Sequence, residues 1–195
     1  MSELSGTRVG FALCGSYCVY ARVFPALEEL VGRGAEVTPL LSENAASTDT
    51  RFGRAEEHIA RLEAITGHTA LRRIADAEPI GPRRLLDALV IAPCTGNTLA
   101  KLASGIADTT VTLAVKSHLR NERPVLIAVS SNDALAANAA SVGALLARRH
   151  IYFVPMRQDD PAGKPRSVVA DFSRIPAALE EALAGRQLQP ILLGP

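Results

Sequence analysis

Near the middle of the chain stands Ala88-Leu89-Val90-Ile91-Ala92-Pro93-Cys94-Thr95-Gly96-Asn97-Thr98, an uninterrupted apolar run followed by a turn of small polar residues. The apolar part, residues 88–92, predicts a strand that is buried on both faces. The turn leads into a helix that begins at Gly96-Asn97. A continuously apolar strand followed directly by a helix is typical of a parallel sheet covered by helices.

The same alternation extends in both directions along the chain. Further strands are predicted at residues 8–13, 36–41, 124–129 and 151–154, and helices at 19–31, 53–66, 69–77 and 133–149. Pro39 cannot donate a backbone hydrogen bond, so the second strand is expected either to lie at or near an edge of the sheet or to end early. The pattern predicts a single doubly wound α/β domain over residues 1–195, with helices on both faces. A polar loop is expected at residues 42–52, a flexible loop at about 157–167, and a C-terminal helix at about 174–186.

Composition excludes several classes of protein. The chain has 195 residues, of which 48% are hydrophobic, and a net charge of +1. A near-neutral charge lacks the basic surface of a nucleic-acid-binding protein. The apolar runs are far shorter than the roughly 18 residues of a membrane span, and the polar N-terminus has no secretory signal. We therefore expect a cytoplasmic protein that takes a small-molecule substrate and binds neither nucleic acid nor membrane.

Small polar residues follow four of the predicted strands, where ligands bind in open parallel sheets. The four turns are Cys14–Ser16, Ser42–Asn44, Pro93–Thr98 and Ser130–Asp133. Gly15-Ser16 opens a helix, and the amides there suit a phosphate. Equally, Ser16 could simply cap that helix, and Ser42 has the same two interpretations. Neither a GxGxxG fingerprint nor a Walker motif is present to indicate NAD or ATP.

The third turn and the helix after it resemble a specific family motif. The motif is Pro-Ala-Ser-Ala-Asn-Thr followed by Ala-Lys-Ile-Ala-x-Gly-Ile-Ala-Asp, from the homo-oligomeric flavin-containing cysteine decarboxylase superfamily. The matching residues are Pro93, Asn97, Thr98, Ala100, Lys101, Ala103, Gly105, Ile106, Ala107 and Asp108. The other three turns agree with the superfamily in order and spacing, so the resemblance covers nearly the whole chain.

Other segments are similar to one branch of that superfamily, the B subunits of dipicolinate synthases. These segments are Gly15–Cys18, Ser47–Gly53, Glu78–Pro82, Ser131–Leu135, Gln158–Pro161, Lys164-Pro165, Val169–Asp171 and Gln187–Leu192. The resemblance implies two-electron oxidation of dihydrodipicolinate, or of 4-hydroxy-tetrahydrodipicolinate, to dipicolinate during sporulation. It also implies a separate A subunit with an NAD(P) site, and a location in the mother cell of a sporulating bacterium.

The resemblance further implies a Rossmann-like flavoprotein fold that binds FMN at a subunit interface within a homo-oligomer, a trimer or a dodecamer. Carried over by motif, the cofactor-binding residues fall into four groups. Gly15 and Ser16 form the first turn, and Ser42 and Asn44 line the second. Pro93, Thr95, Asn97 and Thr98 belong to the turn that holds the phosphate or the ribityl chain, and Ser130, Ser131 and Asn132 face the isoalloxazine.

The sequence departs from the superfamily at one catalytic position. Its decarboxylases carry a His about fourteen residues before the motif proline, where it acts in catalysis. Here that position is Pro79, and no His lies between His68 and Pro93. We therefore assign no catalytic acid or base. A stand-alone FMN-dependent decarboxylase or flavin prenyltransferase, and a non-catalytic stabilising subunit, stay open as alternatives.

The remaining histidines and the cysteines give weaker signals. His58 is predicted to be a solvated helix residue, and His118 and His150 to lie at the surface or at helix ends. Cys14 and Cys18 are too far apart for a redox CxxC motif, and three cysteines make no disulfide framework. Cys94 stands where the motif has Ala, either as a tolerated small residue or as a reactive thiol near the flavin. No cluster has metal-ligand spacing.

Overall fold

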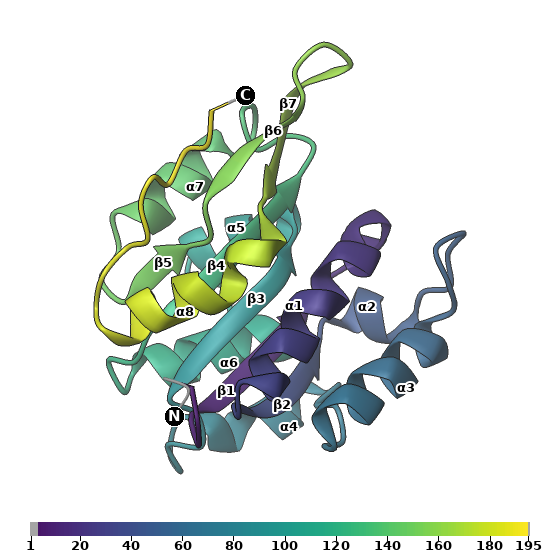
Figure 1. Ribbon diagram of the computed structural model, residues 1–195, viewed down its shortest axis with the longest axis vertical. Helices are drawn as coiled ribbons and strands as arrows, with labels where there is room; N and C mark the ends of the chain where they lie inside the picture. Colours follow the sequence, from purple (N-terminus) through teal and green to yellow (C-terminus); the bar gives the residue numbers. More distant parts are fainter. Residues whose placement is uncertain (1–3, 195) are drawn as a thin grey trace.

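The continuous apolar runs form the parallel part of a seven-stranded sheet in the computed structural model, which describes residues 4–194. Five strands pair in parallel in the order β2-β1-β3-β4-β5 (Figure 1). They are β1 (Arg8–Leu13), β2 (Glu36–Leu41), β3 (Ala88–Cys94), β4 (Val125–Ser131) and β5 (Ile151–Phe153). Each lies within two residues of its predicted position, which confirms the doubly wound α/β fold.

Strand β2 lies at the edge of the sheet, as Pro39 predicts. Its residues pair in parallel with β1, and Pro39 stands opposite Phe11. On its other side the strand meets only a short irregular segment, through a bridge between Leu40 and Leu71. An edge position tolerates proline because the missing N–H interrupts no central ladder.

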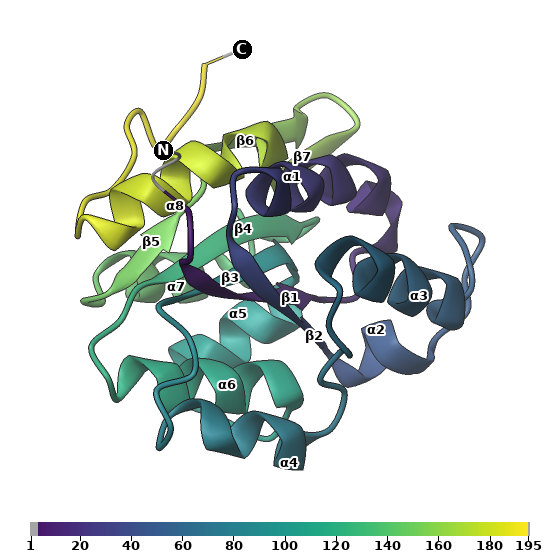
Figure 2. The same cartoon turned by 60° about the horizontal axis from the view of Figure 1, so that its bottom comes forward.

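Helices cover both faces of the sheet (Figure 2). Their bounds are α1 Tyr20–Gly32, α2 Glu43–Ser47, α3 Ala55–Thr66, α4 Ile74–Ala77, α5 Gly96–Ala103, α6 Thr110–Leu119, α7 Ala139–Leu146 and α8 Ile175–Leu183, with short 3₁₀ turns η1 Tyr17–Val19, η2 Glu78–Ile80 and η3 Phe172–Arg174. Successive strand residues point to opposite faces. Val90 packs in the core beneath α1 and α8, whereas Leu89 and Ile91 pack in the core beneath α5 and α6. No helix within residues 4–194 is both long and apolar enough to cross a membrane.

The segment predicted as a loop at about 157–167 is instead a β-hairpin, so that prediction is wrong. Strand β6 (Met156–Asp160) pairs antiparallel with β7 (Lys164–Ala170), and the hairpin projects from the sheet (Figure 1). Strand β7 continues along β4 beyond the end of β5, with Ser130 opposite Val169 and Ser131 opposite Val168. The polar residues 157–164 therefore take strand geometry from pairing within the hairpin, and pairing of Val168 and Val169 with β4 joins the hairpin to the sheet.

Three other expectations need correction. Of the helix predicted at 69–77 only α4 forms, because Leu71 exchanges backbone hydrogen bonds with β2. The helix predicted at 133–149 begins only at Ala139, since the amides of Ala136 and Asn138 both donate to the carbonyl of Asp133 in a preceding turn. Within the polar segment 42–52, for which the sequence predicts a loop, residues 43–47 form α2.

Candidate functional site

The four polar turns gather at the carboxyl-terminal edge of the sheet. After β1 the chain passes to β2 on one side and later returns to β3 on the other, so the β1/β3 boundary is the point where the connections change direction. Gly15 follows β1 there, and Thr95 and Asn97 follow β3. The order 2-1-3-4-5 places the ligand site of open α/β sheets at this boundary.

Two adjoining cavities open at this boundary. The first, of about 880 Å³, lies between the ends of β1, β3 and β4 and the β6–β7 hairpin. The second, of about 560 Å³, lies between the ends of β1, β2 and β3 and the start of α6. Gly15, Thr95 and Asn97 line both. The structure thus joins the two cavities through the residues of the β1/β3 boundary.

Ten of the eleven predicted site residues line these cavities. Ser16, Ser130, Ser131 and Asn132 line the first, Ser42, Asn44 and Thr98 line the second, and Gly15, Thr95 and Asn97 line both. Pro93 is the exception, because it is buried within β3 and lines neither. Pro93 therefore precedes the turn that lines the cavities and is not itself part of their lining.

The Ser16 hydroxyl belongs to the wall of the first cavity. Ser16 makes no side-chain capping bond to η1; its Oγ lies 2.8 Å from Oγ of Ser130. The helix-cap interpretation of Ser16 is therefore wrong. Nearby, the Tyr17 hydroxyl donates to the carbonyl of Asn44 at 2.8 Å and links the first turn to the second. Ser42, in contrast, does cap α2, since its Oγ accepts from the Ala45 amide at 3.3 Å.

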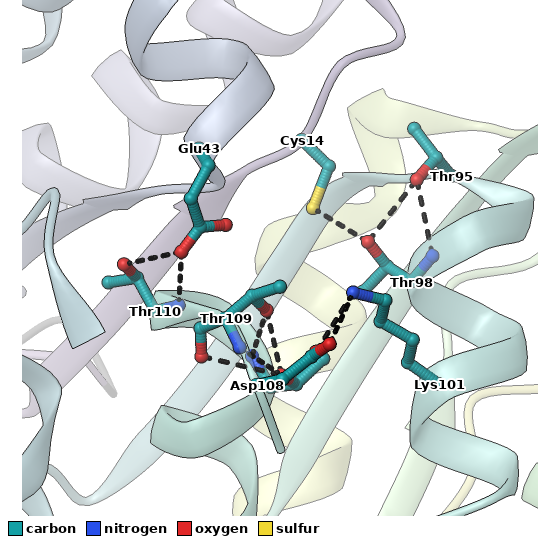
Figure 3. Close-up of polar contacts among 9 residues, drawn as sticks. Cys14, Glu43, Thr95, Thr98, Lys101, Asp108, Thr109 and Thr110 are labelled. Carbon is teal, nitrogen blue, oxygen red and sulfur yellow. Dashed lines mark hydrogen bonds and ion pairs between the residues drawn. The ribbon is translucent and has the colours of Figure 1, made fainter. Parts of the chain in front are cut away.

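The turn after β3 presents the N-terminus of α5 to both cavities. Thr95 caps that helix by accepting a hydrogen bond from the Thr98 amide at 3.4 Å. The Thr98 hydroxyl donates in turn to Sγ of Cys14 at 3.5 Å (Figure 3). The Asn97 side chain remains exposed in the shared wall. Amides at a helix N-terminus attract negative charge, so this wall suits an anionic group.

Asp133 and Asn138, which are not among the predicted site residues, form a polar cluster with the predicted Ser131 beside the same turn. Asp133 accepts from the Ser131 hydroxyl at 2.5 Å and from Nδ2 of Asn138 at 2.7 Å. These hydrogen bonds lower the pKa of the Asp133 carboxyl, and the one from the Ser131 hydroxyl has the largest effect. A Cβ on Gly96 would lie only 2.6 Å from Asn138 Nδ2 and 2.8 Å from Ser131 Oγ. The absence of a side chain at Gly96 therefore lets α5 start against this cluster.

Charged residues line the second cavity, and Figure 3 shows the contacts that they make. Oε1 of Glu43 accepts from the Thr110 amide at 2.8 Å and from the Thr110 hydroxyl at 3.2 Å, at the start of α6. Lys101 forms an ion pair with Asp108 at 2.8 Å. Lys101 and Asp108 both match the family motif in the sequence. That match could have been used to predict them as residues of this site. Glu43 stands between the predicted Ser42 and Asn44.

Comparison with known proteins agrees with this geometry. The family described as Flavoprotein matches residues 1–163. The chain belongs to the flavoprotein family. It is 48% identical over 193 residues to the B subunit of the Bacillus subtilis dipicolinate synthase, and the match covers 99% of this chain and 96% of that protein. The resemblance to the B subunits of dipicolinate synthases is thereby confirmed.

Solved flavoprotein structures show the same fold. The B subunit of the dipicolinate synthase from Bacillus halodurans C superposes with a TM-score of 0.90 and 42% identity, covering 98% of each chain. The FMN-dependent cysteine decarboxylase SpaF superposes with a TM-score of 0.65 and 27% identity, covering 93% of this chain and 97% of that one.

The histidines of this flavoprotein lie away from both cavities, and two of them were mispredicted. His58 is half-buried rather than solvated, with its ring edge-on to Tyr20 at 4.8 Å. His118 is fully buried in α6, where Nε2 lies 3.1 Å from the carbonyl of Pro124 and burial lowers its pKa to about 4. Within residues 4–194, no histidine lines either cavity.

The cysteines of the flavoprotein differ sharply in exposure. Cys14 and Cys94 are buried, and burial raises the pKa of Cys14 to about 11 and that of Cys94 well above its usual value. Both thiols therefore stay protonated near neutral pH, which favours the interpretation of Cys94 as a tolerated small residue. Cys18 is exposed and lines the first cavity. The described residues contain no group of three or more His, Cys, Asp or Glu side chains that could hold a metal ion.

Proposed function

We propose that the two joined cavities bind FMN at the β1/β3 boundary. The observation that carries this proposal is the sharing of Gly15, Thr95 and Asn97 by both cavities at the point where the sheet connections change direction. Flavin mononucleotide binds at this boundary in other sheets with the strand order 2-1-3-4-5. Membership of the flavoprotein family and the FMN-dependent relative SpaF support the same cofactor.

The residues present fit the parts of FMN. The N-terminus of α5, with Thr95 and Asn97 beside it, would hold the phosphate. Ser16, Ser130 and Asn132 offer uncharged hydrogen-bonding groups along the first cavity, which suit the ribityl chain and the polar edge of the ring. Gly96, where a Cβ would clash with Asn138 and Ser131, lets the N-terminus of α5 pack closely into this wall. Glu43 and Asp108 already have partners on the chain and so repel the phosphate less.

We further propose that the chain is the flavin-binding subunit of a two-subunit dipicolinate synthase. Conversion of dihydrodipicolinate to dipicolinate removes a hydride and a proton from the ring, and a bound flavin supplies a two-electron acceptor. The similarity to dipicolinate synthase B subunits over nearly the whole chain supports this assignment. The proposal includes a partner A subunit with the NAD(P) site, a trimeric or dodecameric assembly of this chain, and function in the mother cell during sporulation.

In this scheme the chain positions the cofactor and encloses the substrate between the strand ends and the hairpin. No histidine of the described chain reaches the first cavity, so a decarboxylase that uses a cavity histidine from its own chain is disfavoured. The proton that leaves the dihydrodipicolinate ring would pass to a group of the partner subunit or to water.

An absorbance titration tests the cofactor. Purified chain is titrated with FMN and, separately, with riboflavin, and the flavin bands in the blue and near-ultraviolet are followed. We expect both to bind, with FMN tighter. Asn97→Asp should weaken FMN by tenfold or more through repulsion of the phosphate, and should affect riboflavin little. Absence of any spectral change with FMN would exclude the proposed flavin site and leave a non-catalytic stabilising subunit.

Reconstitution tests the reaction. The chain and an A subunit are assayed separately and together for dipicolinate formation from dihydrodipicolinate. Activity that needs both subunits and FMN supports the proposal. Activity of this chain alone would indicate a stand-alone flavoenzyme, and full activity of the pair with an Asn97→Asp chain that has lost FMN would make the flavin dispensable.

A further inference from the structure

The first cavity has two chemically different walls. The ends of β1, β3 and β4 present small uncharged groups such as Ser16, Asn97 and Ser130. Another part of the lining is the β6–β7 hairpin, which contributes the charged residues Asp159, Lys164 and Arg166. A flavin held against the strand ends would leave its substrate facing the hairpin, so the charges of the hairpin bear on substrate choice.

Of the charged groups that line this cavity, most already have partners. Lys164 pairs with Asp159 at 3.1 Å. Asp133 is held by the hydrogen bonds from Ser131 and Asn138. The guanidinium of Arg166, by contrast, makes no hydrogen bond or ion pair with any residue of the described chain, 4–194. Arg166 is therefore the cation in this cavity that is available to an incoming anion.

The backbone around Arg166 is fixed on both sides. The Leu135 amide donates to the carbonyl of Arg166 at 3.0 Å, which ties the hairpin to the turn after β4. Nε2 of Gln158 donates to the carbonyl of the preceding Pro165 at 2.9 Å. The next residue, Ser167, is buried. The side chain is therefore presented from a held segment, which lowers the entropy lost when it binds a ligand.

We propose that Arg166 binds a carboxylate of a small anionic substrate in the first cavity. This inference rests on the proposed function, in which the substrate is a ring dicarboxylate. A guanidinium offers a planar pair of N–H donors that matches a carboxylate in two parallel hydrogen bonds. Bound in this way, the substrate lies between Arg166 and the wall of strand ends, where the flavin would be.

The phosphate of FMN is the other anion that could reach this cavity. The α5 N-terminus at Thr95 and Asn97, which belongs to the strand-end part of the lining, offers that phosphate a separate place. An experiment can distinguish the FMN phosphate from the substrate carboxylate. A variant at Arg166 should weaken binding of the dicarboxylate and leave binding of FMN unaffected.

The test is calorimetric titration of the full chain with pyridine-2,6-dicarboxylate, in metal-free buffer, with and without saturating FMN. Wild type is compared with Arg166→Gln and Arg166→Lys. Arg157→Gln is the matched control, because Arg157 lies on the same hairpin, is exposed and does not line the cavity. The uncharged pyridine-2,6-dicarboxamide serves as the control ligand, and FMN and riboflavin are titrated into every variant.

We expect Arg166→Gln to raise the Kd of the dicarboxylate about tenfold, with Arg166→Lys between it and wild type and Arg157→Gln unchanged. Binding of the dicarboxamide should not change. Equal dicarboxylate affinity in wild type and Arg166→Gln, or no binding by wild type, overturns the proposal. So does a loss of FMN but not riboflavin in Arg166→Gln, which would assign Arg166 to the phosphate. Failure of wild type to bind FMN would instead count against the flavin site, and the titration without FMN still reports on Arg166.

Discussion

Oγ of Ser16 lies 2.8 Å from Oγ of Ser130, which joins the end of β1 to the end of β4. Strand β3 lies between these two strands, so the contact spans the strand whose following turn starts α5. Both serines line the first cavity, so the contact ties two strand ends together at the proposed flavin site.

A double-mutant cycle tests this contact. Ser16→Ala and Ser130→Ala should each lower the free energy of unfolding by about 1 kcal/mol, since each leaves the other hydroxyl without its partner. The double variant should cost clearly less than the sum of the two, because the second substitution removes a group already unpaired. Urea unfolding at a single pH measures all four proteins. Strict additivity would show that the two hydroxyls do not interact.

Gly96→Ala probes the cradle at the start of α5. The added Cβ would meet Asn138 Nδ2 at 2.6 Å and Ser131 Oγ at 2.8 Å, and both groups are held by Asp133. We expect a loss of about 1–3 kcal/mol of stability and weaker FMN binding, measured by thermal unfolding and absorbance titration.

Gly143→Ala is the matched control for that substitution. It lies inside α7 with nothing within 4 Å of the added Cβ, so it should stabilise the protein by about 0.5–1 kcal/mol. Equal effects of the two substitutions would argue against a tight cradle at Gly96.

Much of the fold could be predicted because its central strands are apolar on both faces. The short apolar runs at 8–13, 88–92 and 124–129 predict buried strands, and Pro39 indicates that β2 lies at the edge. The β6–β7 hairpin could not be predicted, since Gln158 to Lys164 is polar and takes strand geometry from antiparallel pairing within the hairpin, which Val168 and Val169 join to β4. Leu71 was likewise predicted to be helical, but its backbone forms hydrogen bonds with the edge strand β2 instead.

The same division applies to the site. Turn residues such as Gly15, Ser16 and Asn97 could be predicted, because they directly follow apolar strands at one edge of the sheet. Asp133 stands in one of the four predicted turns but was not assigned to the site, and Arg166 was missed because nothing local distinguishes it from other surface charges. They reach the cavity only through the turn after β4 and through the hairpin, and both of these arrangements depend on tertiary contacts.

Thiol reactivity should follow burial. Near pH 7.5 an aromatic disulfide reagent should titrate one thiol of the native protein, Cys18, which is exposed in the first cavity. Cys14 and Cys94 should react only after unfolding, because burial raises the pKa of each and holds it as the thiol. Cys18→Ser should abolish the native reaction, and Cys94→Ala should leave FMN binding unchanged. Modification of Cys94 in the folded protein would restore the alternative of a reactive thiol near the flavin.

Stability should fall in mild acid because of His118. Burial lowers its folded pKa to about 4 from the ordinary value of 6.5, so below pH 6.5 the unfolded chain takes up a proton that the folded chain does not. Stability is therefore lost as pH falls from about 6.5 to about 4 and does not change further through this group below that range. The variant His118→Gln can keep the hydrogen bond to the Pro124 carbonyl but cannot titrate.

Between pH 7.5 and 4.5 the unfolding free energy of His118→Gln should fall by about 2 kcal/mol less than that of wild type. The difference between the two proteins isolates His118 from His58, whose pKa burial also lowers. Parallel urea-unfolding profiles for the two proteins across this range would show that His118 does not carry the acid sensitivity.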